Sequence, residues 1–256
     1  MFRFASLGSG SRGNATLVQS AQTLVLIDCG YAVKEVVRRT AELGIDPAEI
    51  DAVLVTHEHG DHMRGVGALS RRFDLDVWMT HGTWHAADFG RVDSLQLFNS
   101  HDAALQVGDI EVIPVPVPHD AREPTQFVLK HAGLALGLLT DLGSHTPHLI
   151  ECFAELDALL LECNHDPEML RNGPYPPRLQ ARVGGVYGHL NNEQAAGLLQ
   201  AINHKRLRHL VAGHLSEKNN LPELARRALC AVGPHIEDCL TLLGQDAVSD
   251  WFDVDP

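Results

Sequence analysis

The chain contains 256 residues, of which 45% are hydrophobic and 21% are charged, and these proportions exclude an intrinsically disordered protein. Its formal net charge of −13 argues against a broad electrostatic surface for nucleic acid, although it leaves room for a local one. No apolar run approaches the about 20 residues of a membrane helix, and residues 1–7 lack the cationic start of a secretory signal, so we expect no membrane partner.

Apolar, β-rich stretches recur along the whole chain. They predict strands at residues 2–7, 15–19, 23–28, 52–56, 77–80, 110–117, 126–130, 134–140, 158–162, 207–212 and 239–243. Apolar residues at spacings of three and four predict helices at residues 32–43, 62–72, 192–202 and 222–232. The early strands follow one another as hairpins, whereas helices separate the later ones. This order predicts sheets with helices packed outside, in the α/β class.

No internal repeat or linker interrupts the pattern, so we predict a single domain over residues 1–256. The stretch Asn172–Gly188 is rich in proline and glycine and predicts a long functional loop. Five cysteines are scattered without a CxxC spacing. They indicate buried thiols in a reduced, cytoplasmic setting rather than a disulfide framework or a cysteine–zinc site.

Sixteen histidines are many for this length, and four ligand-type residues gather directly after one predicted strand. The strand 51–56 ends at Thr56. His57 follows it directly and His59 lies two residues further on, so both rings can face the same side of an extended segment. A turn at Gly60 then brings in Asp61 and His62. Imidazole and carboxylate groups suit zinc, iron or manganese. The alternative is a solvated polar loop that happens to be rich in histidine.

This HxHxDH pattern resembles the signature of the metallo-β-lactamase superfamily, and further elements of that family follow in order. They are Leu26–Gly30, Val117–Asp120, Leu139–Gly143 and Val211–Ser216. The resemblance implies an αββα four-layer sandwich. It also implies two divalent metal ions, zinc first, with manganese or iron as alternatives. One ion would be held by His57, His59 and His119, and the other by Asp61, His62 and His214. Asp141 would bridge both, and Asp28 would orient ligands without binding metal.

Motifs outside the ligands point to one branch of the superfamily. The bridging position is Asp141, where zinc-dependent β-lactamases typically have cysteine, so antibiotic hydrolysis is disfavoured. The turn Gly8–Thr16 could be a tight connection only, but it resembles the opening of the YycJ/WalJ-like family, which is described as DNA exonucleases. Matches to that family continue at residues 119–121, 140–143, 162–166, 188–193 and 214–220.

Three of these stretches also resemble the ribonuclease Z pattern, in which a strand-end glutamate pairs with a histidine. By this likeness Glu162 and His189 form a relay that protonates the leaving group, and the carboxylate fixes the imidazole tautomer and raises its pKa. In the alternative interpretation, His189 caps the helix 192–202 and Glu162 is a buried acid with a local partner. His165 is at least as well explained as a polar residue at a helix N-terminus.

Residues 170–192 contain no Asp or Glu in an otherwise acidic chain, and they lead to His189. Guanidinium groups bind phosphates and aromatic rings stack on bases. We therefore predict that Arg178, Arg182 and Tyr187 contact substrate, although their charges could be incidental to a surface loop.

The sequence thus predicts a dinuclear metal-dependent hydrolase, a phosphodiesterase or nuclease that acts on DNA. His189, supported by Glu162, would protonate the leaving oxygen, and Asp61 would also orient the attacking hydroxide. A thioesterase or small-molecule phosphodiesterase of the same fold stays open, and so does a non-catalytic metal-binding regulatory protein. The sequence does not specify an oligomeric state.

Overall fold

The computed structural model describes residues 1–202 and 204–255. Its backbone contacts divide the chain into two compact units. Unit 1 comprises Met1–Pro116, Ala121–Leu134 and Gly244–Pro256, and unit 2 comprises Val117–Asp120 and Ala135–Leu243. Both units combine strands with helices, which confirms the predicted α/β class. The single domain over residues 1–256 stays a prediction.

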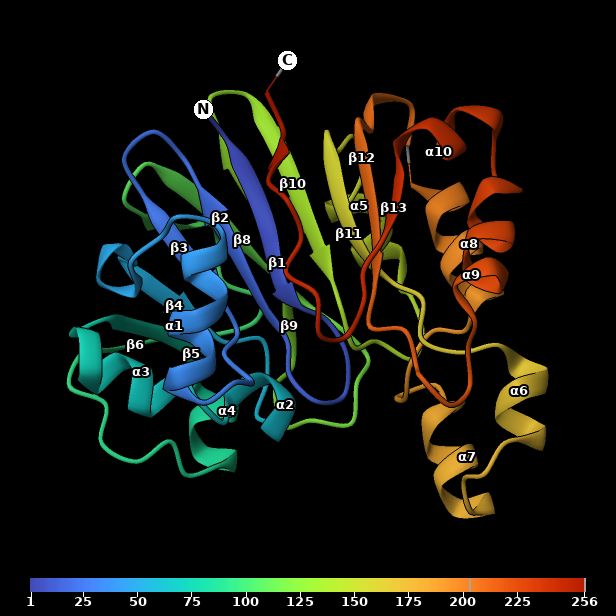
Figure 1. Ribbon diagram of the computed structural model, residues 1–256, viewed down its shortest axis with the longest axis horizontal. Coiled ribbons are helices and arrows are strands. Elements are labelled where there is room, and N and C mark those ends of the chain that lie inside the picture. Colours follow the sequence, from blue (N-terminus) through green and yellow to red (C-terminus); the bar gives the residue numbers. More distant parts are fainter. Residues whose placement is uncertain (203, 256) are drawn as a thin grey trace. The chain divides into compact units, whose positions relative to one another are not determined.

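Unit 1 contains a seven-stranded sheet in the order β14-β1-β2-β3-β4-β5-β6 (Figure 1). Its strands are β1 (Arg3–Gly8), β2 (Ala15–Gln19), β3 (Leu24–Ile27), β4 (Ala52–Leu54), β5 (Asp76–Thr80), β6 (Leu95–Phe98) and β14 (Phe252–Asp253). The pairs β1–β14, β1–β2 and β2–β3 are antiparallel, as the predicted hairpins require. From β3 to β6 the strands run parallel. A second, antiparallel group comprises β7 (Leu105–Val107), β8 (Ile110–Pro116) and β9 (Thr125–His131).

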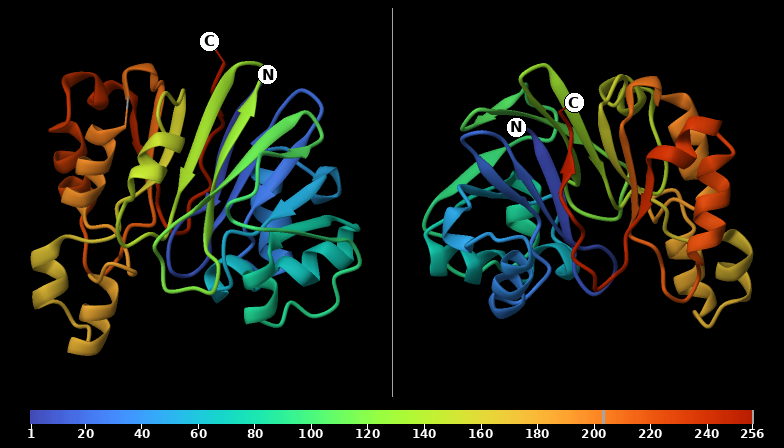
Figure 2. Two further views of the ribbon diagram at one scale, coloured as in Figure 1. Left: turned by 180° about the vertical axis from the view of Figure 1, so that it is seen from behind. Right: turned by 45° about the horizontal axis from the view of Figure 1, so that its top comes forward.

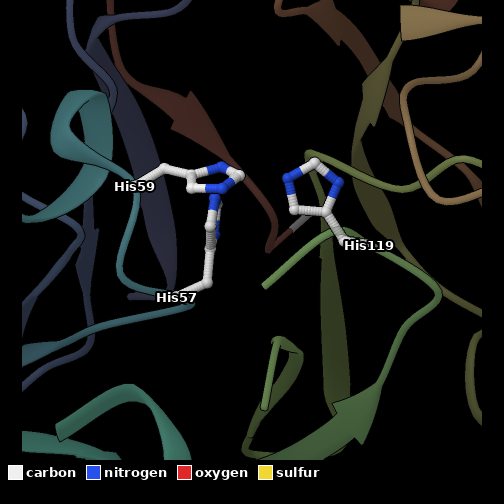
Figure 3. Close-up of side chains that lie close together, drawn as sticks. All are labelled: His57, His59 and His119. Carbon is white, nitrogen blue, oxygen red and sulfur yellow. The ribbon is translucent and has the colours of Figure 1, made fainter. Parts of the chain in front are cut away.

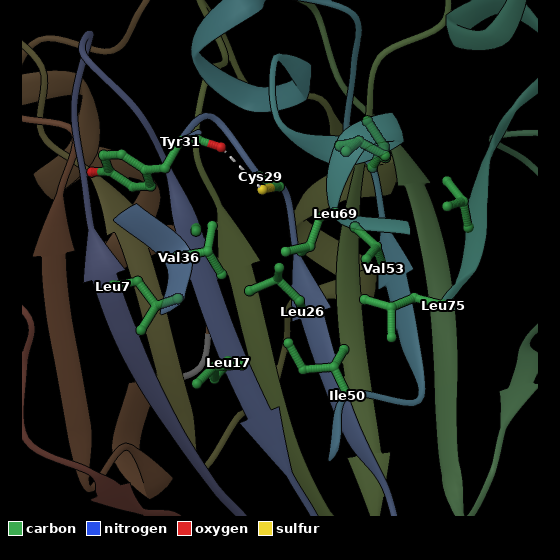
Figure 4. Close-up of a cluster of buried hydrophobic side chains, with 14 of the residues drawn as sticks. Leu7, Leu17, Leu26, Cys29, Tyr31, Val36, Ile50, Val53, Leu69 and Leu75 are labelled. Atoms are coloured by element: carbon green, nitrogen blue, oxygen red, sulfur yellow. Dashed lines mark hydrogen bonds between the residues drawn. The ribbon is translucent and has the colours of Figure 1, made fainter. Parts of the chain in front are cut away.

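Helices cover one face of this sheet and bury the main apolar cluster of unit 1. They are α1 (Val33–Glu42), α2 (Gly60–Met63), α3 (Val66–Phe73) and α4 (His81–Ala86), with a short 3-10 helix at Pro47–Glu49. Val36 of α1 and Leu69 of α3 pack in one cluster with Leu26 and Val53 of the sheet (Figure 4). Burial of such side chains contributes about 1.5–3 kcal/mol each, and it fixes the strand ends from which the site is built.

The helix predicted over residues 62–72 is interrupted, because α2 and α3 are separated at Arg64 and Gly65. Two tertiary hydrogen bonds replace the helical bond expected there. The backbone N–H of Gly65 donates to the carbonyl of Cys29 at 2.8 Å, and the carbonyl of Asp61 accepts from the N–H of Asn14 at 2.8 Å. A side chain at Gly65 would lie 1.9 Å from the carbonyl oxygen of Tyr31. The glycine is therefore required by this close backbone approach.

Unit 2 is built on four parallel strands, β10 (Leu134–Leu139), β11 (Ala158–Glu162), β12 (His209–Gly213) and β13 (Leu240–Leu242). Helices α8 (Asn192–Ala201) and α9 (Pro222–Cys230) lie side by side, and α10 (Pro234–Cys239) packs on β12 (Figures 1 and 2). Helix α5 (Pro147–Cys152) precedes β11, and a 3-10 helix spans His204–Arg206. The carboxyl ends of parallel strands lie at one edge of the sheet. Glu162, at the end of β11, and His214, directly after β12, therefore lie at the same edge.

The prediction of a long loop at Asn172–Gly188 is wrong, because a helix of seven residues lies within that stretch. Helix α6 (Pro167–Asn172) runs to its start, and α7 (Pro177–Val183) lies within it. Pro177 occupies the first turn of α7, where its missing N–H costs nothing, and Gly184 ends the helix. Proline and glycine here mark the start and the end of a helix rather than exclude one. Within residues 1–202 and 204–255, no helix combines the length and apolar character that crossing a bilayer requires.

Candidate metal centre and proton relay

The first cluster of predicted ligands lies in unit 1, on the segment that follows β4. The rings of His57 and His59 are 4.6 Å apart between centroids and nearly perpendicular (Figure 3). His62, in the short helix α2, brings its ring to 4.2 Å from that of His57. A carboxylate oxygen of Asp61 lies 3.7 Å from Nε2 of His62. The structure therefore gathers the four residues of the HxHxDH pattern within unit 1.

Asp28 organises this cluster through hydrogen bonds, as predicted for a residue that orients ligands. Its carboxylate accepts from the backbone N–H and the hydroxyl of Thr56, each at 2.8 Å, and from Nδ1 of His62 at 2.7 Å. Because the Thr56 hydroxyl gives its single proton to Asp28, it accepts from Nδ1 of His57 at 2.9 Å. Both imidazoles thus carry their proton on Nδ1 and present the Nε2 lone pair, the form that binds a metal ion.

His119 belongs to unit 2 and is held in the same tautomer. Its Nδ1 lies 3.0 Å from the carbonyl oxygen of Gly188, and a carbonyl can only accept, so Nδ1 carries the proton and Nε2 the lone pair. The segment itself is fixed by the N–H of Gly143, which donates to the carbonyl of Pro118 at 2.9 Å. His119 is labelled in Figure 3.

The second cluster lies wholly in unit 2 and joins Asp141, Glu162, His189 and His214. Each of the four offers one ligand-type atom, and these atoms lie within 4.8 Å of one another. Oε1 of Glu162 accepts from Nδ1 of His189 at 2.7 Å and from Nδ1 of His214 at 3.0 Å. Oδ1 of Asp141 lies 3.2 Å and 3.1 Å from the same two nitrogens. The predicted pairing of Glu162 with His189 is therefore present as geometry.

Backbone bonds hold Glu162 in place, and its charge controls the protonation of its neighbours. Its other oxygen accepts from the N–H groups of Leu142 and Leu190, each at 3.1 Å. Burial raises the pKa of Glu162, but the two imidazoles outweigh burial and lower it to about 2. Burial lowers the pKa of His189, but Glu162 and Asp141 raise it well above its ordinary value. The same opposition raises the pKa of His214 to about 9. The two carboxylates therefore stabilise the protonated form of His189.

Three predicted site residues adopt the left-handed backbone conformation that favours glycine. Asp28, Asp141 and His214 have φ values of 61°, 55° and 55°. Each follows directly or closely after a strand. Non-glycine residues in this region store about 1–3 kcal/mol of strain, which the surrounding structure must offset. Such strain clusters at functional sites, and here it coincides with positions that the sequence pattern singled out.

The alternative in which His189 caps helix α8 is wrong. Asn191 is the N-cap, and its side chain accepts from the N–H of Gln194 in a complete capping box. His165 is 2% exposed, and it precedes Asp166, the N-cap of α6. Burial lowers its pKa to about 4, so it is a neutral, buried imidazole outside the relay.

Helix α7 carries two of the three predicted substrate contacts. Arg178 and Arg182 lie one turn apart on it and are exposed. Arg182 is paired with Asp120 at 2.5 Å, an interaction that the sequence did not reveal. Tyr187 is 61% exposed and lies two residues before His189. Sequence reasoning also missed the contacts of Thr56 with Asp28 and His57, although Thr56 directly precedes the ligand pattern.

Comparisons with known proteins support the resemblance. Residues 23–214 match the β-lactamase superfamily domain. The chain is 34% identical over 233 residues to exodeoxyribonuclease WalJ of Streptococcus pneumoniae, covering 89% of this chain and 87% of that one. It is 36% identical over 234 residues to exodeoxyribonuclease YycJ of Bacillus anthracis, covering 90% and 88%. A shorter match, 35% identical over 97 residues, covers 38% of this chain and 30% of a ribonuclease Z of Methanopyrus kandleri.

Among solved structures, the metallo-β-lactamase fold protein YhfI from Bacillus subtilis superposes with a TM-score of 0.75. The alignment covers 98% of this chain and 100% of that protein at 18% identity. Identity at this level carries information on the fold alone. It confirms the predicted metallo-β-lactamase fold, in which mixed sheets are flanked by helices.

Proposed function

This chain belongs to the β-lactamase superfamily, and from its similarity to exodeoxyribonucleases over about nine-tenths of its length we propose that it is a metal-dependent nuclease that hydrolyses phosphodiester bonds of DNA. The observation that carries the proposal is the 2.7 Å hydrogen bond between Glu162 and His189. A relay of this kind is useful to a reaction with a poor, alkoxide leaving group. A phosphodiester of DNA has such a leaving group, whereas a thiolate leaves readily without a proton.

The predicted ligand set is retained for two divalent ions. His57, His59 and His119 would hold one ion, and Asp61, His62 and His214 the other, with Asp141 shared. The chemistry of the donors fits this role, because hydrogen bonds at Nδ1 hold His57, His62 and His119 in the tautomer that carries its lone pair on Nε2. Bound ions would offset negative charge on phosphoryl oxygens and lower the pKa of attacking water. Zinc suits the nitrogen and oxygen donors, and manganese or iron are alternatives. The division of ligands between the ions rests on the sequence pattern.

His189 is proposed to donate the proton that the leaving oxygen needs. Its Nδ1 is engaged by Glu162, so its Nε2–H is the group available to a substrate, and its side chain is 21% exposed while Glu162 is fully buried. Glu162 stabilises the imidazolium and fixes the ring. Asp61 is proposed both to bind metal and to orient the attacking water through its carboxylate.

The exposed face of α7 is proposed to bind the nucleic acid. Arg178 and Arg182 would contact backbone phosphates, and Tyr187 would stack on a base. Arg182 must exchange its partner Asp120 for phosphate, so Arg178 is the more readily available of the two. The proposed setting is the cytoplasm, which suits the buried thiols of Cys29 and Cys163.

The test is the activity of metal-reconstituted protein on four substrates: labelled duplex DNA, labelled single-stranded DNA, RNA and a model thioester. The proposal expects metal-dependent release of nucleotides from DNA that a chelator abolishes. Hydrolysis of the thioester alone would replace the nuclease with a thioesterase. Stoichiometric metal without hydrolysis of any substrate would support a regulatory protein instead.

A further inference from the structure

In the turn between β1 and β2, the side chain of Asn14 contacts the first cluster of predicted ligands. The turn is anchored from behind by Tyr31, whose hydroxyl donates to the carbonyl of Gly13 at 2.6 Å. Gln245 adds a second anchor, because its Oε1 accepts from the N–H of Arg12 at 2.9 Å. Asn14 itself is 5% exposed. Its backbone N–H donates to the carbonyl of Asp61 at 2.8 Å.

The orientation of the Asn14 amide follows from its contacts. Its Oδ1 accepts from the N–H of Gly10 at 2.7 Å, and its Nδ2 donates to the carbonyl of Gly10 at 3.1 Å. The same Nδ2 lies 3.0 Å from Nε2 of His62 and 3.4 Å from the carbonyl of Asp61. Rotating the amide by half a turn would place its oxygen against these three acceptors and its nitrogen against the N–H of Gly10. The N–H group therefore points at His62.

Nε2 of His62 accepts this hydrogen bond through its lone pair. Because Nδ1 of His62 donates to Asp28 at 2.7 Å, Nε2 has no proton in the neutral ring and accepts from Asn14. The ring is 0% exposed, so water does not compete for this lone pair. A metal ion bound to His62 through Nε2 needs the same lone pair.

We propose that Asn14 is a positioning residue that sets the metal affinity of the His62 ligand position. Its amide donates a hydrogen bond to Nε2 of His62. A metal ion that binds at Nε2 has to replace this hydrogen bond. The bonds of Asn14 to Gly10 and to the Asp61 backbone need not change in that exchange, whereas Nδ2 also lies 3.3 Å from Oδ2 of Asp61, a second proposed ligand of the same ion. The inference rests on the proposed assignment of His62 as a metal ligand.

The test is the affinity of the protein for Zn²⁺ and for Mn²⁺, measured by competition with a chromophoric chelator in the absence of substrate. Asn14→Ala removes the competing donor, so the proposed site that contains His62 is expected to bind about 2- to 10-fold more tightly, as one neutral hydrogen bond allows. Asn14→Asp places a carboxylate beside the same position and is expected to give a larger gain, with a lower melting temperature before metal is added.

Gln245→Ala is the matched control, because it loosens the same turn without touching His62. Its metal affinity is expected to stay within about 2-fold of wild type, which is no more than the smallest effect expected from losing one neutral hydrogen bond. Unchanged or weaker binding in both Asn14 variants would overturn the proposal, and so would equal tightening in Gln245→Ala. These outcomes are distinct from failure of the proposed function, which would appear as wild-type protein that binds no metal or binds it without cleaving DNA.

Discussion

The two clusters hold their histidines in different ways. In unit 1 one carboxylate, that of Asp28, is shared among a backbone N–H, a hydroxyl and one imidazole, and the rings of His57 and His62 carry their lone pair on Nε2. In unit 2 two carboxylates, Asp141 and Glu162, face two imidazoles whose pKa values are raised. The first arrangement leaves a lone pair on Nε2 of His57 and His62, whereas the second stabilises a proton on Nδ1 of His189 and His214. The difference follows from the partners of Nδ1, which are a hydroxyl or one carboxylate in unit 1 and two carboxylates in unit 2.

The largest expected effect concerns the proton in unit 2. His189→Ala removes the proposed donor, so cleavage of DNA should fall by about 10²- to 10⁴-fold, the usual contribution of general acid catalysis. Metal content should stay at the wild-type value, because the proposed ligands remain. Rates and bound metal are measured on the same sample, with exposed His145→Ala of the same unit as the control. Loss of metal together with activity would assign His189 to the metal centre instead.

Another buried imidazole of unit 2, that of His165, sharpens the comparison, because its partner is an amide. Nδ1 of His165 lies 3.3 Å from Oδ1 of Asn164, and burial lowers its pKa from 6.5 to about 4. The unfolded chain therefore takes up this proton first as the pH falls, and the free energy of unfolding should decrease between pH 6.5 and pH 4. The decrease amounts to about 3 kcal/mol at most.

Denaturant unfolding of wild type and His165→Gln across this pH range measures that contribution. The variant has no imidazole at this position, so its stability should depend less on pH by the same amount. Parallel pH profiles for the two proteins would show that the His165 environment does not penalise the proton.

In unit 1 we expect a smaller effect, on metal affinity, from changing the carboxylate that orients the ligands. Asp28→Asn keeps the shape of the side chain but replaces one acceptor oxygen with a donor. The new donor opposes either the backbone N–H of Thr56 or, in the other orientation, both the Thr56 hydroxyl and Nδ1 of His62. Metal affinity should fall by about 10- to 100-fold. Chelator competition measures the change, and Asp46→Asn, at an exposed helix start of the same unit, is the control. Full wild-type affinity would mean that the backbone alone orients these ligands.

The smallest expected effect lies on α7. Arg178→Ala should weaken DNA binding a few-fold and lower the slope of its salt dependence by about 1. Arg182→Ala should have less effect, because its partner Asp120 offsets its charge. Binding to labelled DNA at several salt concentrations separates the two, with Arg38→Ala on α1 as the control. Equal slopes for all three variants would remove α7 from the proposed substrate surface.

The ligand pattern could be predicted from the sequence because its residues are adjacent. His57 and His59 follow a strand, Asp61 and His62 come after the turn at Gly60, and local chain geometry alone brings them together. The pairing of Glu162 with His189 could not be read from spacing, since 27 positions separate them, and it came from a family resemblance.

The features that the sequence did not reveal depend on contacts between distant segments. The interruption between α2 and α3 arises from hydrogen bonds to Cys29 and Asn14, which lie in other segments far away along the chain. The Arg182–Asp120 pair likewise joins positions 62 apart. Helix α7 was missed for a different reason: proline in a first helical turn and glycine beyond a last one have the same composition as a loop.

The division of labour between the clusters is tested most directly by changing the leaving group. Wild type and His189→Ala, both loaded with metal, are compared on DNA and on bis(p-nitrophenyl) phosphate, whose phenolate leaves without protonation. The account predicts that His189→Ala loses about 10²- to 10⁴-fold on DNA and keeps nearly wild-type rates on the activated ester. An equal loss on both substrates, or wild-type cleavage of DNA, would contradict the proton-donor role of His189.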